Sequence, residues 1–110
     1  MAYDDVLAQD LRALLADRDD VVERRLFGAL GFMVSGHLAV CAGGTGELMV
    51  RVGPGGHAAA RERPGTSDFV MSGRVAKGWV LVDQSAIPTE QALSEWVAQG
   101  VAFATSLPPK

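Results

Sequence analysis

The sequence has little cysteine and no long apolar run. Its 110 residues include a single cysteine, Cys41, which excludes an internal disulfide and a cysteine-rich zinc module. No segment approaches the roughly 18 uninterrupted apolar residues of a membrane-spanning helix. The N-terminus, MAYDDVLAQD, lacks the basic region and apolar stretch of a secretory signal. We therefore expect a cytoplasmic protein with no membrane partner.

Familiar catalytic motifs are missing as well. The sequence contains no G-x-S-x-G, no H-E-x-x-H and no paired carboxylates placed for acid–base catalysis. Residues 53–58 do match the dinucleotide-binding pattern G-x-G-x-x-A after a predicted strand. However, Pro64 ends the short helix that they would open, and the strands around them are predicted to be antiparallel. We interpret the segment as a turn and expect no cofactor.

His37 and Cys41 are the remaining candidates for chemistry, as a metal site or a Cys/His nucleophile pair. Four residues apart on one strand, they would share a face but stand roughly 13 Å apart by strand rise. That distance is too long for a shared proton or ion, and zinc usually needs three or four protein ligands. We therefore expect a buried, inert Cys41, no metal site and no enzyme activity.

Apolar periodicity predicts a helix near each end of the chain. In residues 3–16, leucines recur at spacings of three and four, which marks the buried face of an amphipathic helix. The second helix is expected from Thr89, a suitable N-cap, to the residues before Pro108. Trp96 lies on its apolar stripe, and both Trp96 and Trp79 are predicted core residues.

Short strands separated by glycine-rich turns are predicted between these helices. The segments ERRLFG, GFMV, HLAVCA and ELMVRV precede a short helix in GPGGHAAARERP, and DFVMSG and KGWVLVD follow it. In ELMVRV, alternation turns Leu48, Val50 and Val52 toward the core and makes Arg51 a surface residue. The order helix, three to four strands, helix, two strands, helix predicts a single α+β domain over residues 1–110. Its antiparallel sheet of about five to six strands is flanked by helices.

Two local predictions concern glycine and histidine. In FGALGF, Gly28 and Gly31 would let the backbone turn or bulge, while Phe27 and Phe32 anchor the flanks in the core. His57, in the short middle helix, is predicted to be exposed.

Charge is distributed unevenly along the chain, whose net charge is −3. Residues 1–23 hold seven acidic and two basic residues, whereas residues 24–77 hold three acidic and seven basic ones. A locally basic face can bind an anion or a phosphate backbone even in an acidic protein. Strand parity separates Arg24 from Arg25, so the candidate basic surface consists of Arg24, Arg51, Arg74 and Lys77.

Taken together, the segments RRLFGALGFMVSGHLAV, ELMVRVGP, GRVAKGWVLVD and LSEWVAQGVAFATSLPPK resemble the TfoX N-terminal domain family. This family is known from bacterial competence regulators of the TfoX/Sxy type. The resemblance covers nearly the whole chain and implies a compact α+β fold with no catalytic residues to carry over. The residues that match the family signature are Phe27, Gly28, Phe32, Gly36, Arg51, Gly53, Gly73, Lys77, Gly78, Trp79 and Asp83.

Three functional hypotheses follow. The first is a stand-alone, non-enzymatic regulatory domain that binds a protein partner, including a second copy of itself through an unpaired strand edge. The second is a nucleic-acid-binding module that uses the basic surface. The third, and least favoured, is a small enzyme that uses Cys41 and His37.

Overall fold

The structure is a computed structural model that describes residues 3–26 and 28–108. It has the α+β architecture predicted from the sequence, with a six-stranded antiparallel sheet. The helices and strands are α1 (Asp5–Leu14), β1 (Val21–Leu26), β2 (Ala29–Val34), β3 (His37–Ala42), β4 (Leu48–Arg51), α2 (His57–Arg61), β5 (Thr66–Met71), β6 (Arg74–Val82) and α3 (Glu90–Ser106). Two 3-10 turns, Pro54–Gly56 and Gln84–Ala86, precede α2 and α3.

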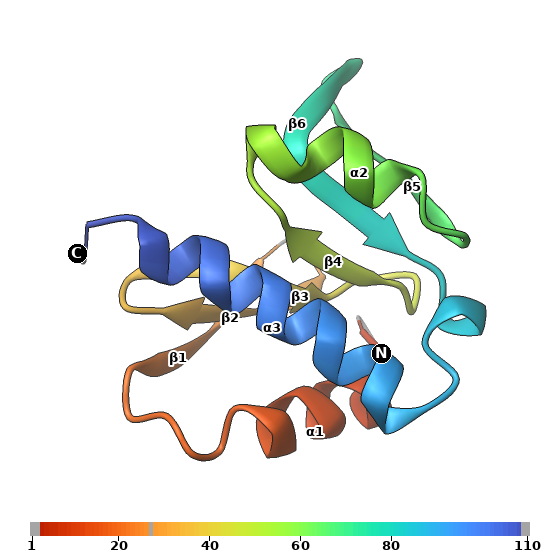
Figure 1. Ribbon diagram of the computed structural model, residues 1–110. Helices are drawn as coiled ribbons and strands as arrows, with labels where there is room; N and C mark the ends of the chain where they lie inside the picture. Colours follow the sequence, from red (N-terminus) through yellow and green to blue (C-terminus); the bar gives the residue numbers. More distant parts are fainter. Residues whose placement is uncertain (1–2, 27, 109–110) are drawn as a thin grey trace.

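The sheet begins as a meander and ends with a crossover. Its strand order is β1-β2-β3-β4-β6-β5, so β6 lies between β4 and the edge strand β5. The segment that contains α2 connects β4 to β5, and a tight hairpin then brings β6 back beside β4 (Figure 1). Strands β1 and β5 therefore form the two edges of the sheet.

The main hydrophobic core lies between the sheet and the helices. It joins apolar side chains from α1, α2 and α3 to one face of the central strands, and α3 runs across this face in Figure 1. Leu48 and Val50 of β4 are fully buried in this core, and Val52 is 6% exposed, which confirms the predicted alternation. The helix-covered core holds the fold together because it buries the largest apolar side chains, including Trp96 and Phe32.

The two long helices begin at capping side chains. Asp4 Oδ1 accepts hydrogen bonds from the backbone N–H groups of Val6 (2.8 Å) and Leu7 (3.1 Å). Thr89 Oγ1 accepts one from the N–H of Ala92 at 3.1 Å, which confirms the predicted N-cap of α3. Both caps satisfy donors that a helix leaves unpaired in its first turn.

A β-bulge interrupts the pairing of β2 with β3. Phe32 pairs with Val40, but Met33 pairs with Leu38, so Ala39 is the extra residue. α3 crosses closely here, because a Cβ added to Gly100 would lie 2.6 Å from the carbonyl oxygen of Ala39. An extra residue reverses the side-chain alternation on one side of the bulge, which changes the face of every residue before it.

The bulge corrects the prediction that His37 and Cys41 share a face. His37 is on the helix side, where its Nε2 lies 2.6 Å from the carbonyl oxygen of Pro108, beyond the end of α3. Cys41 faces the opposite side of the sheet. Simple strand parity was wrong here because it assumes an unbroken ladder between residues 37 and 41.

The prediction for the FGALGF segment is confirmed only at Gly28, which lies in the turn after β1. Residues 29–32 belong to β2, so the predicted turn or bulge at Gly31 was wrong. Gly28, with a φ of 83°, lies between β1 and β2, and Phe32 is fully buried. Gly31 belongs to β2 and pairs with Arg24 and Cys41. Phe27 lies outside the described residues, so its predicted anchoring role is not addressed by the structure.

Candidate functional site

The second face of the sheet is apolar although none of the described helices covers it. Alternation places Met49 of β4 and Trp79 and Leu81 of β6 opposite the core residues of the same strands. All three are half-buried. An antiparallel sheet usually presents polar side chains on a face that stays in water. This surface, which we call the open face, therefore differs from an ordinary solvated sheet.

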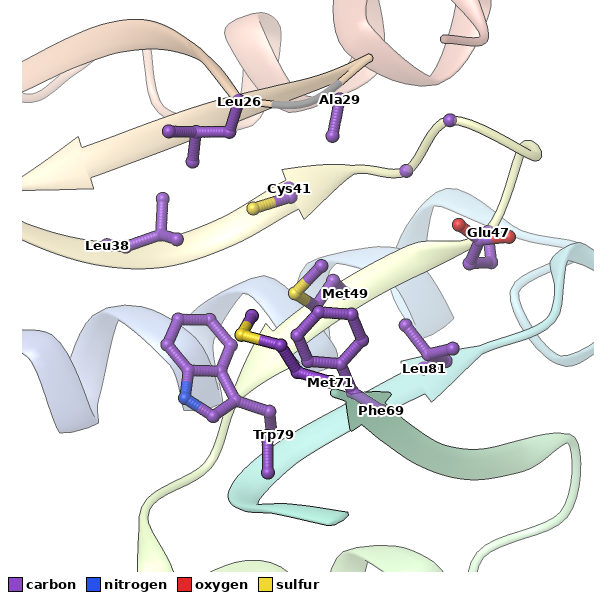
Figure 2. A pocket seen from close by; sticks show the side chains of 13 residues that line it. Leu26, Ala29, Leu38, Cys41, Glu47, Met49, Phe69, Met71, Trp79 and Leu81 are labelled. Atoms are coloured by element: carbon purple, nitrogen blue, oxygen red, sulfur yellow. The ribbon is translucent and has the colours of Figure 1, made fainter. Parts of the chain in front are cut away.

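A hollow of about 460 Å³ occupies the open face (Figure 2). This volume falls in the range of roughly 300–1,000 Å³ that is typical of binding sites. It is lined by Leu26, Ala29, Leu38, Cys41, Gly43, Gly44, Glu47, Met49, Phe69, Met71, Ala76, Trp79 and Leu81. Among the described residues of the lining, Glu47 is the only one that carries a charge.

The hollow has two walls from opposite ends of the sheet. Leu26 and Ala29, at the connection of β1 and β2, stand on one side, and Phe69, Met71 and Trp79 stand on the other (Figure 2). The second wall belongs to the β5–β6 hairpin, whose ladder is irregular between Asp68 and Val70. Bulges increase local twist, and the twisted hairpin borders the hollow at this edge of the open face.

The end of that hairpin is itself apolar and exposed. Val70 and Met71 are each 56% exposed and Val75 is 51% exposed. Ser72 and Gly73 connect the strands with φ values of 53° and 78°. Positive φ at both central residues is the signature of a type I′ turn, which suits a two-residue hairpin. We call residues 70–75 the hairpin tip.

The four candidate basic residues are spread across the sheet. Arg24 lies on the edge strand β1, whereas Arg74 and Lys77 lie on β6, near the opposite edge. Four strand spacings separate β1 from β6, a distance of roughly 19 Å. The structure thus brings Arg74 and Lys77 onto one strand but sets Arg24 far from them, an arrangement that does not favour one continuous basic patch.

Arg51, the fourth candidate, is held between two aromatic rings. Its Cζ lies 5.3 Å from the centre of the Trp79 ring and 5.2 Å from that of Phe103 on α3. Arg51 is half-buried rather than simply a surface residue, and both rings lie within cation–π distance of its guanidinium. Trp79, predicted to be core, is half-buried on the open face, while Trp96 is buried as predicted.

His57 is not the exposed residue that the sequence predicted. Its Nδ1 accepts a hydrogen bond from the N–H of Gly78 at 2.7 Å, and its Nε2 lies 3.1 Å from Asp68 Oδ1. Arg61 Nε also donates to that oxygen, at 3.0 Å, and the His57 contact is the largest cause of the lowered pKa of Asp68. This cluster attaches α2 to β5 and β6, which is a structural role.

Cys41 lines the hollow but is not prepared for nucleophilic chemistry. Its side chain is 1% exposed, and burial raises the pKa of the thiol to about 12. The reactive form of cysteine is the thiolate, and His37 is on the other face of the sheet.

Within residues 3–26 and 28–108, no three His, Cys, Asp or Glu side chains gather as metal ligands. No helix in this part of the chain is long and apolar enough to cross a membrane.

Sequence reasoning missed the hollow, although the strands carried a signal for it. Segments such as ALGFMV, HLAVCA and GWVLV are apolar at almost every position, on both faces of each strand. That pattern is typical of sheets covered on two faces. The described helices cover only one face, so the apolar residues that remain form the hollow.

Comparison with known families agrees with the fold and with the sequence motifs. Searches among curated proteins and among solved structures found no significant match. The model of the TfoX N-terminal domain matches residues 13–104, from the C-terminal end of α1 to the last turn of α3. The match covers most of the chain, and the chain therefore belongs to the TfoX N-terminal domain family.

Proposed function

We propose that this chain is a cytoplasmic, non-enzymatic regulatory domain, related to competence regulators, that acts by binding another protein through its open face. The observation that carries the proposal is the apolar hollow on a sheet face that no described helix covers. Contiguous exposed apolar surface is costly in water and commonly marks an interaction site. The methionines at the hollow, Met49 and Met71, are flexible side chains that suit contact with a partner surface.

Two further observations support association rather than catalysis. The thiol at the hollow has a raised pKa, and His37 lies on the other side of the sheet, so nucleophilic activation has no support here. Arg24 lies on β1, far from Arg74 and Lys77 on β6, and Arg51 on β4 contacts aromatic rings, so the four candidates do not form one continuous basic track for a nucleic-acid backbone.

The test is affinity capture from the native cell followed by binding measurements with the purified partner. Met49→Lys places a charge in the floor of the hollow, and Val6→Lys is the matched control, because Val6 is 70% exposed on α1. We expect the wild type and Val6→Lys to bind the purified partner equally. Met49→Lys should weaken binding by at least about tenfold.

Folding of each variant is checked by circular dichroism, and Leu26→Lys, at the rim of the hollow, replaces Met49→Lys if the latter does not fold. A partner that binds wild type and a folded hollow variant with the same affinity would overturn the proposal.

A further inference from the structure

We propose that the open face is a self-association surface, in which the hairpin tip of each copy occupies the hollow of the other. This inference rests on the proposed role of the open face as a binding surface. It specifies the occupant as a second copy of this chain and the geometry as a reciprocal, two-fold pair.

The first argument is that one molecule carries both halves of an apolar contact. The hairpin tip exposes Val70, Met71 and Val75 by half or more of their surface. Val70 and Val75 pair directly across the two strands, and Met71 lines the hollow. The tip is therefore apolar on both of its faces. A two-stranded ribbon with two apolar faces buries more apolar surface when it is inserted between two surfaces than when it rests on one.

The second argument is that the apolar surface is continuous. Met71 and Ala76 of the hairpin line the hollow, so the exposed tip and the hollow share a border. In Figure 1 the hairpin extends away from α1 and α3, where another molecule can reach it. Two copies that face each other can cover both features at once, and a two-fold axis makes the two contacts identical.

The third argument is complementarity of charge. Glu47 is the only charged residue among the described lining of the hollow. Arg74 is exposed on the hairpin tip, and within residues 3–26 and 28–108 no carboxylate forms an ion pair with it. The acid closest to the hairpin tip in sequence, Asp68, is already held by Arg61 and His57. Arg74 of one tip and Glu47 of the facing hollow carry opposite charges, which attract each other and set the orientation of the pair.

The reciprocal arrangement makes a sharp prediction about charge reversal. Glu47→Lys and Arg74→Glu each place like charges together twice in a pair of identical copies. A mixture of the two variants restores both contacts. The introduced lysine meets the introduced glutamate in one contact, and the unchanged Glu47 of one copy meets the unchanged Arg74 of the other in the second. Restoration in the mixture is the outcome that a merely destabilised fold or an unrelated interface does not produce.

The experiment is sedimentation velocity over a range of protein concentrations. We expect the wild type to dimerise, each reversal variant to dissociate at least about tenfold more readily, and the equimolar mixture to recover the dimer. Val6→Lys, on the helix side, should dimerise as the wild type does. Glu47→Gln replaces Glu47→Lys if the turn between β3 and β4 does not tolerate lysine, and it should still weaken the dimer. Val75→Glu tests the apolar contact independently.

A wild type that stays monomeric into the high micromolar range would overturn this inference. So would a mixture of folded reversal variants that remains monomeric, or a dimer that Val75→Glu leaves intact. These failures are separable from failure of the proposed function. A monomer that still binds a different protein through Met49 contradicts only the self-association, whereas a dimer whose hollow binds no other protein contradicts only the proposed role.

Discussion

The residues that look most chemical in the sequence serve as structural contacts in the fold. Arg51 is held between Trp79 and Phe103, and His57 accepts the N–H of Gly78. Three of these residues, Arg51, Gly78 and Trp79, match the family signature. At the scale of single residues, these three signature residues lie at a joint where the end of β4, Gly78 of β6 and α3 meet.

Gly78 at this joint should tolerate no side chain. Its φ is 96°, and an added Cβ would lie 3.0 Å from the carbonyl carbon of Gly53 and 3.1 Å from the nitrogen of Pro54. We expect Gly78→Ala to lower the free energy of unfolding by about 1–3 kcal/mol, measured by urea denaturation. Gly55→Ala is the control, because nothing lies within 4 Å of its added Cβ. It should change stability by no more than about 0.5 kcal/mol, and equal losses in both variants would contradict the steric explanation.

The sequence predicts a residue's role only where the alternation of its own strand decides it, and not where the role depends on a contact with a distant segment. Alternation correctly placed Leu48 and Val50 in the core and Arg51 on the other face. It could not show that Arg51 lies against Phe103, 52 positions along the chain. The prediction for His57 was wrong for the same reason, because its partner Gly78 comes from a strand 21 residues away.

At the scale of elements, periodicity and turn chemistry predicted almost the entire order of helices and strands. The exception is the bulge at Ala39, which reverses the faces of residues on one side of it. Nothing in HLAVCA distinguishes a bulged strand from a regular one, because the residues after His37 are apolar on both faces and give no alternation to follow. At the bulge Gly100 of α3 packs closely against Ala39, a contact between distant segments that local sequence patterns do not report.

Connections between elements are also fixed by specific contacts, and Asp20 provides a test with pH. Asp20 precedes β1, accepts hydrogen bonds from Arg18 (2.9 Å) and Ser35 Oγ (2.7 Å), and so attaches this loop to the turn between β2 and β3. The bonds to Arg18 and then to Ser35 lower its pKa to about 2. Because the carboxylate form is favoured in the folded state, this contribution to stability is present above pH ~4 and is lost as the pH falls through about 2.

We expect Asp20→Asn to flatten the fall in stability between these pH values, measured as the urea midpoint against pH. Asp19→Asn is the matched control, since no hydrogen bond of Asp19 to the described residues is present, and it should keep the wild-type profile. A profile that Asp20→Asn leaves unchanged would show that this loop contact does not couple to folding.

At the scale of the whole molecule, the main result is an asymmetric sheet with one face under helices and one apolar face open. The sequence predicts the sheet but not which face stays open, because the central strands are apolar on both sides. Helix docking decides that question, and it depends on how α1, α2 and α3 share the core. The hollow could not be located from the sequence for the same reason.

The asymmetry also predicts how the molecule unfolds. Trp96 is 2% exposed beneath the sheet, whereas Trp79 is half-buried on the open face next to Val80, which is fully buried in the core. Since β6 contributes to both faces, the open face should not unfold separately from the core.

Two single-tryptophan variants test this expectation: Trp79→Phe leaves Trp96 as the only fluorescent reporter, and Trp96→Phe leaves Trp79. Within each variant, at low protein concentration, we expect tryptophan fluorescence and far-ultraviolet circular dichroism to give the same urea midpoint. If the Trp79 signal changed at lower urea than the circular dichroism of the same variant, β6 and the hairpin tip would form a separately unfolding unit. The proposed dimer contact would then rest on a segment that opens while the core stays folded.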